Sequence, residues 1–199
     1  MPEPVILASA SSARAALLCA AGVRFEIEPA AIDEARIKRL ARAIGDTAIA
    51  CALALAVEKA RTVSARNPGA LVIGADQILV AGEEWFDKPA DRDGARTQLR
   101  ALRDRSHALA TAACVMTDGA VLWQATSEPE LAMRSFSDAF LEEYVEAEGD
   151  VLLGSVGAYR LEGRGVQLFC RIAGDYFAVL GLPLLDLLGF LRERKVLPR

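Results

Sequence analysis

The first residues that could do chemistry lie near the N-terminus, where an apolar segment is followed by small hydroxyl residues and an arginine. This order predicts a strand over residues 5–9, a tight turn and a helix over 12–21. The free N–H groups and the dipole of a helix N-terminus favour anions. Ser9 and Arg14 would add a hydroxyl and a forked donor, which predicts a phosphate site. The alternative is a plain serine cap with Arg14 in solvent.

A second candidate is Asp76, which interrupts the apolar stretch of residues 71–80. A carboxylate in such a strand costs free energy unless it is ion-paired, hydrogen-bonded or bound to a metal. We therefore expect Asp76 to have a partner of one of these kinds. The alternative places it at a bulge or strand end in contact with water.

Two lysines and an acidic pair complete the set of candidates. Lys59 lies in an otherwise largely apolar helical segment, and Lys88 follows an expected hairpin. Either lysine alone is an ordinary surface charge, but with Arg14 they could form a positive ring for a triphosphate. Asp33 and Glu34 offer adjacent carboxylates for Mg²⁺ or a water, or form a plain acidic loop.

These residue types match what hydrolysis at phosphorus needs. Such a reaction requires neutralised phosphate charge, a metal that bridges phosphate oxygens, and a carboxylate that orients or deprotonates water. The sequence contains no Walker loop and no serine hydrolase elbow, which argues against both of those enzyme classes.

The remaining pattern predicts the elements that must position these residues. A helix is expected over 47–63, with Leu53, Ala54, Val57 and Ala60 on one face. Other helices are expected over 91–102, 137–147 and 184–194, and strands over 25–27, 71–80, 107–117, 120–134 and 166–172. Turns are expected at Gly82 and at Asp118-Gly119. This order mixes βα units with hairpins, which predicts an α/β fold with a mixed sheet.

Composition limits the function classes. The 199 residues suit one sizeable α/β domain, or one domain with a smaller lobe. No apolar run approaches the roughly 20 residues of a membrane span, and no secretory signal is visible, so we expect a soluble cytoplasmic protein. The net charge of -4 argues against binding a nucleic acid polymer.

Metal and thiol chemistry are also limited. The single histidine, His107, leaves little room for a multi-histidine metal site, so a metal would be a hard ion on oxygen ligands. The role of His107 itself stays open. The four cysteines match no zinc or redox spacing and are expected to be buried, reduced thiols.

Short fragments in a fixed order extend over nearly the whole chain. They are Leu7-Ala8-Ser9-Ala10-Ser11 with Arg14, Asp33-Glu34, Leu55-Ala56-Val57-Glu58-Lys59-Ala60, Ile73-Gly74-Ala75-Asp76, Lys88-Pro89, Gly157-Ala158-Tyr159 and Val179-Leu180-Gly181-Leu182-Pro183-Leu184. Each fragment is weak alone, but the ordered set is specific, and it resembles the Maf family.

The resemblance implies a fold and an activity. The fold would be a single inosine triphosphatase-like domain over residues 1–199, an elongated mixed sheet flanked by helices with a cleft between two lobes. The activity would be hydrolysis of nucleoside triphosphates between the α and β phosphates. By the same resemblance, Asp76 would be the catalytic base, and Lys59 and Lys88 would hold phosphate or stabilise the transition state. Ser9 and Arg14 would bind phosphate, and Glu34 with Asp76 would hold Mg²⁺ or Mn²⁺.

Three positions depart from the pyrimidine-preferring branch of the family. Two of them, Gln77 and Glu162, resemble the branch that hydrolyses 7-methyl-GTP, whereas Ala13 replaces a large residue and leaves the tolerance of other bases open. The pyrimidine-preferring branch has arginine, threonine and glutamine where this chain has Ala13, Gln77 and Glu162. A carboxylate can accept from the donor edge of guanine and favours the positive charge of an N7-methylated base. The alternative for Glu162 is a solvent-exposed turn residue between Arg160 and Arg164.

Other functions remain open at this level. A dTTP/UTP or broad-range pyrophosphatase is the alternative enzyme. A nucleotide-binding inhibitor of septum formation, a role also attached to this family, is the alternative of another class. The strand pair over 107–134 would offer an edge for a homodimer.

Overall fold

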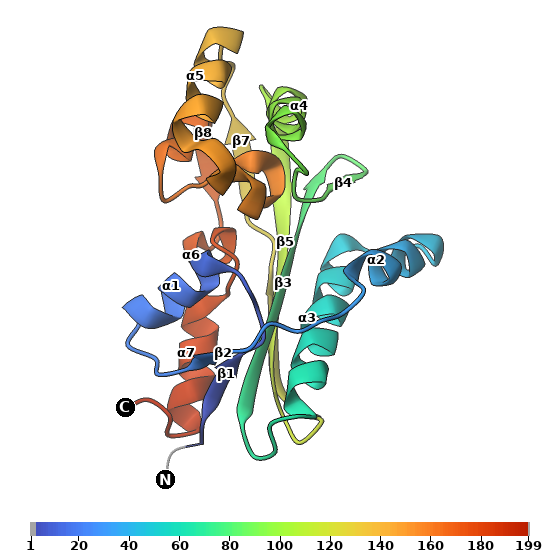
Figure 1. The fold of residues 1–199 in the computed structure, drawn as a ribbon, viewed down its shortest axis with the longest axis vertical. Coiled ribbons are helices and arrows are strands. Elements are labelled where there is room, and N and C mark those ends of the chain that lie inside the picture. Colours follow the sequence, from blue (N-terminus) through green and yellow to red (C-terminus); the bar gives the residue numbers. More distant parts are fainter. Residues whose placement is uncertain (1–2, 199) are drawn as a thin grey trace. The chain divides into compact units, whose positions relative to one another are not determined.

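The computed structural model describes residues 3–198 (Figure 1). The strands are β1 (Val5–Leu7), β2 (Glu26–Ile27), β3 (Leu71–Ala81), β4 (Glu84–Phe86), β5 (Ser106–Thr117), β6 (Ala120–Ser127), β7 (Glu130–Met133) and β8 (Phe169–Ala173). The α-helices are α1 (Ser12–Ala20), α2 (Glu34–Ala43), α3 (Ala48–Ser64), α4 (Arg92–Leu102), α5 (Asp138–Glu148), α6 (Tyr176–Val179) and α7 (Leu184–Glu193). Short 3₁₀ helices cover Gly149–Gly154, Val156–Ala158 and Arg164–Leu168.

The strands are hydrogen-bonded in the order β2-β1-β3-β5-β7-β8, with β4 on β3 and β6 on β5. Strand β1 is parallel to β2 and β3, whereas the β3–β4, β5–β6, β5–β7 and β7–β8 pairs are antiparallel. The predicted mixed sheet with flanking helices is therefore confirmed. The described chain divides into two compact units: residues up to Gln77 with Ala110–Ser127 and the part from Asp175 onward, and Ile78–Leu109 with Glu128–Gly174.

In the first unit, helices cover both faces of β3 (Figure 1). Leu71, Ile73 and Ala75 belong to a buried cluster that includes residues of α1 and α7. The alternate residues face α3, since a Cβ on Gly74 would lie only 2.1 Å from the Ala56 carbonyl oxygen. A strand buried on both faces reads as a nearly continuous apolar run. Asp76, two residues after Gly74, therefore lies on the face of the strand that α3 covers.

One predicted strand differs from the structure in a way that the sequence explains. The strand expected over 120–134 is two strands, separated at Glu128 and Pro129. Both pair with β5, through Thr111 opposite Ser127 and Ser106 opposite Ala132. Pro129 lacks a backbone donor, which explains an interruption of the strand there. Helices α2 and α6 were not predicted.

The second unit contains the buried His107. Its Nε2 lies 2.8 Å from the Tyr159 hydroxyl, and its ring packs against Phe169. Burial lowers the pKa of His107 to about 4, so the ring is neutral near pH 7. In this structure His107 is a core residue with one polar partner.

The exposure of the four cysteines corrects the expectation that all of them are buried. Cys51 and Cys114 are buried, but Cys19 and Cys170 are exposed, so the thiols are not uniformly buried.

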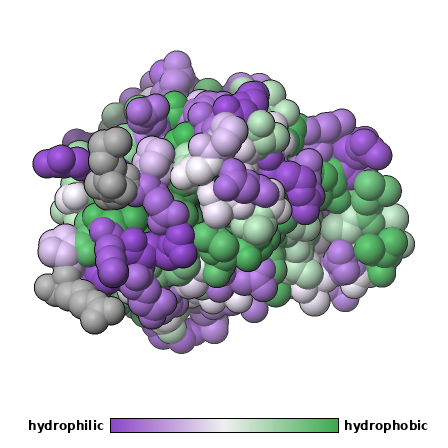
Figure 2. Space-filling view, turned by 90° about the horizontal axis from the view of Figure 1, so that it is seen from below, coloured by the Kyte–Doolittle hydropathy of each residue, from purple (hydrophilic) through white to green (hydrophobic). Residues whose placement is uncertain are grey.

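On the face in Figure 2, hydrophilic and hydrophobic residues are interspersed. Within residues 3–198, every helix is too short or too polar to cross a membrane.

Candidate active site

Three charged side chains of the first unit meet at one point. The Lys59 ammonium lies 2.5 Å from Asp76 Oδ1 and 2.7 Å from Glu34 Oε1. Lys59 and Asp76 are only 8% and 5% exposed, whereas the Glu34 side chain is 45% exposed. The cluster is thus a buried ion pair with a third, half-exposed carboxylate.

Helix α3 and strand β3 bring the buried pair together. Thr47 caps α3 by accepting from the Ala50 N–H at 3.3 Å. The face of α3 that contains Ala56, Lys59 and Ala60 is buried. Burial of an ion pair is tolerated only when each charge finds its partner, as here. Asp76 lies within β3, so the bulge or strand-end alternative is wrong, and Lys59 is not a surface lysine.

The predicted acidic pair does not act as a pair. Asp33 is the N-cap of α2 and accepts from the Arg36 N–H at 2.9 Å. Glu34, the first residue of the helix, contacts Lys59 instead. The local sequence explains this division, because aspartate is a favoured helix N-cap.

The carboxylates of this cluster are the candidate ligands for a divalent metal. Among the described residues, no group of three or more His, Cys, Asp or Glu side chains is placed to hold a metal. The Glu34 and Asp76 oxygens nevertheless lie within 2.7 Å of the same ammonium. Mg²⁺ is commonly held by one or two carboxylates together with substrate phosphates. Glu34 and Asp76 would therefore suit a metal whose remaining ligands came from substrate and water.

Ser9 follows β1, just before α1. Its Oγ accepts from the Ser11 N–H at 3.2 Å and from Arg14 Nη1 at 3.0 Å. Ser11, not Ser9, caps α1 by accepting from the Arg14 N–H at 3.4 Å. The serine cap therefore exists, and Ser9 remains beside it with a hydroxyl proton to donate.

Arg14 is buried, so the alternative that left it in solvent is wrong. Its guanidinium also donates to the Gly181 carbonyl at 2.9 Å and the Ala75 carbonyl at 3.0 Å. Burial lowers the pKa of Arg14, and the charges of Asp76 and Glu34 oppose that shift. The guanidinium, which was predicted to bind phosphate, therefore already donates three of its hydrogens to groups inside the protein.

The side chain of Gln77 also faces inward. Its Nε2 donates to Thr111 Oγ1 and the Ala178 carbonyl, each at 2.8 Å, and to the Val179 carbonyl at 3.2 Å. Carbonyls only accept, so the amide nitrogen must face them, and Oε1 is the remaining polar atom of the side chain. Thr111, which sequence reasoning missed, joins this network. Ala13 is half-buried in the first turn of α1.

Two predicted site residues belong to the second unit. Lys88 is exposed between β4 and α4. Glu162 accepts from Arg160 Nε at 3.3 Å, and Arg160 also lies 3.7 Å from Glu148. Glu162 is thus paired within its own turn, and the substrate roles of Lys88 and Glu162 stay predictions.

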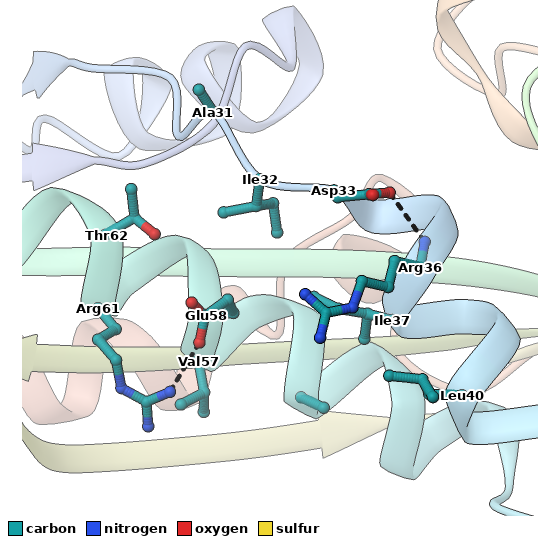
Figure 3. Close-up of a pocket in the computed structure, with 11 residues that line it drawn as sticks. Ala31, Ile32, Asp33, Arg36, Ile37, Leu40, Val57, Glu58, Arg61 and Thr62 are labelled. Atoms are coloured by element: carbon teal, nitrogen blue, oxygen red, sulfur yellow. Dashed lines mark hydrogen bonds and ion pairs between the residues drawn. The ribbon is translucent and has the colours of Figure 1, made fainter.

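A groove of about 590 Å³ lies between α2 and α3 (Figure 3). Ile32, Ile37 and Val57 contribute apolar lining, and Asp33 and Glu58 line it as well. Lys59, Asp76 and Glu34 are not among its lining residues. Helices α2 and α3 therefore form a groove of mixed lining, and the charged cluster, which also needs β3, lies outside that lining.

Known proteins match the chain over nearly its whole length. A family model described as Maf-like protein matches residues 4–194. Curated relatives from Granulibacter bethesdensis and Hyphomonas neptunium are each 51% identical, covering 97% and 100% of this chain and 98% and 100% of their own lengths. One from Paramagnetospirillum magneticum is 50% identical over 94% of this chain and 97% of its own length. Each is named nucleoside triphosphate pyrophosphatase. The chain therefore belongs to the Maf-like protein family.

Proposed function

We propose that this protein is a nucleoside triphosphate pyrophosphatase that hydrolyses the bond between the α and β phosphates. The observation that carries the proposal is the cluster of Lys59, Asp76 and Glu34, which joins one ammonium to two carboxylates. The name shared by relatives about 50% identical supports the same reaction class. The products would be a nucleoside monophosphate and pyrophosphate.

In this mechanism Asp76 orients the attacking water and accepts its proton. Lys59 fixes the carboxylate through the 2.5 Å contact and supplies positive charge near the phosphates. Ser9 donates its remaining hydroxyl proton to a phosphate oxygen, and Lys88 adds a second cation. Glu34 and Asp76 would hold Mg²⁺ or Mn²⁺, which neutralises phosphate charge when bound.

The finer proposal is that the preferred base is 7-methylguanine. Glu162 carries this inference, since a carboxylate accepts from the guanine donor edge and favours the cationic methylated base. Gln77 is consistent with it, because the atom left for a ligand is the acceptor Oε1. Cytoplasmic location and a homodimer stay predictions.

The test measures pyrophosphate release from 7-methyl-GTP, GTP, UTP and dTTP with Mg²⁺ or Mn²⁺. We expect turnover by the wild type and a loss of at least about 100-fold in Asp76→Asn, because general-base catalysis contributes roughly that much or more. Glu58→Gln, at the half-exposed neighbour of Lys59, is the matched control and should retain activity.

The outcomes separate the alternatives. Preference for UTP or dTTP would keep the reaction and refute the assignment of the base. An active Asp76→Asn would refute the mechanism. Nucleotide binding by the wild type with no turnover of any substrate would favour the regulatory role instead.

A further inference from the structure

On one edge of β3, the neighbouring strand β1 ends just before the position of the proposed catalytic residue, Asp76. The ladder between β1 and β3 pairs Leu7 with Ile73, and the Ala8 N–H then donates to the Ile73 carbonyl at 2.8 Å. Carbonyls of alternate residues point to the same edge of a strand, so the next one on this edge belongs to Ala75. The chain after Ala8 has by then turned toward α1.

Arg14 takes the place of the missing strand. Its Nη1 donates to the Ala75 carbonyl at 3.0 Å, at the peptide that directly precedes Asp76. Its Nε donates to the Gly181 carbonyl at 2.9 Å, in the turn between α6 and α7. A Cβ on Gly181 would lie 3.1 Å from Arg14 Nε, so the guanidinium is closely enclosed. One side chain thus joins three segments that are distant in sequence.

The same guanidinium also sets the polarity of Ser9. Ser9 Oγ accepts from both Arg14 Nη1 and the Ser11 N–H. A serine hydroxyl has two acceptor lone pairs and one proton, so the group left over is the donor. Arg14 therefore leaves Ser9 with a proton for a phosphate oxygen.

We propose that Arg14 is a positioning residue, which aligns Asp76 through the Ala75 carbonyl and orients the Ser9 hydroxyl, and does not itself grip the phosphates. The proposal rests on the proposed function for the roles of Asp76 and Ser9. Arg14 is 8% exposed and has three donor hydrogens bonded inside the protein, which is the opposite of an open fork.

The test compares Arg14→Ala and Arg14→Lys with the control Arg24→Ala, an exposed arginine of the same unit. The readouts are kcat, KM, affinity for inorganic pyrophosphate by calorimetry, and hydrogen exchange of peptides covering residues 74–78. We expect kcat to fall about tenfold or more, while KM and pyrophosphate affinity change less than about threefold. Exchange should rise in these peptides, and guanidinium ion at non-denaturing concentration should restore part of kcat in Arg14→Ala.

Other results would overturn the proposal. If pyrophosphate affinity falls as much as kcat/KM, Arg14 is a phosphate ligand. If exchange at residues 74–78 is unchanged, Arg14 does not hold the strand. Arg14→Lys keeps the stem and the charge, and it serves if the alanine variant does not fold. A wild type without turnover would refute the proposed function. Hydrogen exchange of residues 74–78 would still decide whether Arg14 holds β3, because exchange should rise in Arg14→Ala and added guanidinium ion should lower it again.

Discussion

Replacement of Gly74 by alanine would separate the two elements that hold the buried ion pair. The new Cβ would lie 2.1 Å from the Ala56 carbonyl oxygen and 2.9 Å from Ala60 Cβ. Carbon and carbonyl oxygen approach to about 3.3 Å at closest, so α3 and β3 must move apart by about 1 Å. That displacement stretches the 2.5 Å contact between Lys59 and Asp76 to the limit of a hydrogen bond. Overpacking of this kind costs about 1–3 kcal/mol of unfolding free energy.

Denaturant unfolding and kcat on the best substrate measure the two effects. We expect Gly74→Ala to lose stability as stated and to lose at least about tenfold in kcat, because a misplacement near 1 Å can cost up to about 100-fold. Gly189→Ala in α7 is the matched control, since a Cβ there meets no atom within 4 Å. It should gain about 0.5–1 kcal/mol through helix propensity. Wild-type stability and kcat in Gly74→Ala would refute the reasoning.

Two further predictions concern buried charge. Lys59→Met should cost about 3–5 kcal/mol of unfolding free energy by leaving Asp76 buried without its cation, and Lys59→Met/Asp76→Leu should recover most of that stability while remaining inactive; equal stability of the single and double variants would contradict this. The pKa of His107 is lowered to about 4 from 6.5, so the unfolded chain binds a proton first as pH falls. Stability from the neutral ring is present above pH 6.5 and is lost between about 6.5 and 4, which amounts to about 2 kcal/mol by pH 5. His107→Gln should show a shallower decline in denaturant melts at pH 7 and 5, and parallel declines would refute the assignment.

Most helices and turns could be predicted because the residues that cap a helix or form a turn lie within the element itself. Thr47, Asp91 and Ser137 cap the helices that were expected to begin there. Gly82 and Gly119 have positive φ in the predicted turns. These features depend on residues a few positions apart, which a single sequence displays directly.

The site depended on distant contacts, which the pattern could not supply. The helix face expected to contain Ala54 and Val57 lines the groove, whereas the buried face carries Lys59. Alanine-rich helices lack a strong contrast between faces, so periodicity could not choose between them. The burial of Arg14 depends on the Ala75 and Gly181 carbonyls, which no local pattern links to it. The Asp33 cap did carry a local signal, aspartate before a helical segment, which could have identified α2.

The helix that carries Glu34, α2, is much less buried than the two elements that carry Lys59 and Asp76. Of its ten residues only Ala41 is buried, and the groove separates part of its apolar face from α3. Segments with little buried apolar surface open locally at a small fraction of the global unfolding free energy. Opening of α2 would carry Glu34 away while α3 and β3 kept Lys59 and Asp76 together. The cluster therefore combines an ion pair buried in the core with one carboxylate on a peripheral helix, whose local opening would separate Glu34 from Lys59 without unfolding the core.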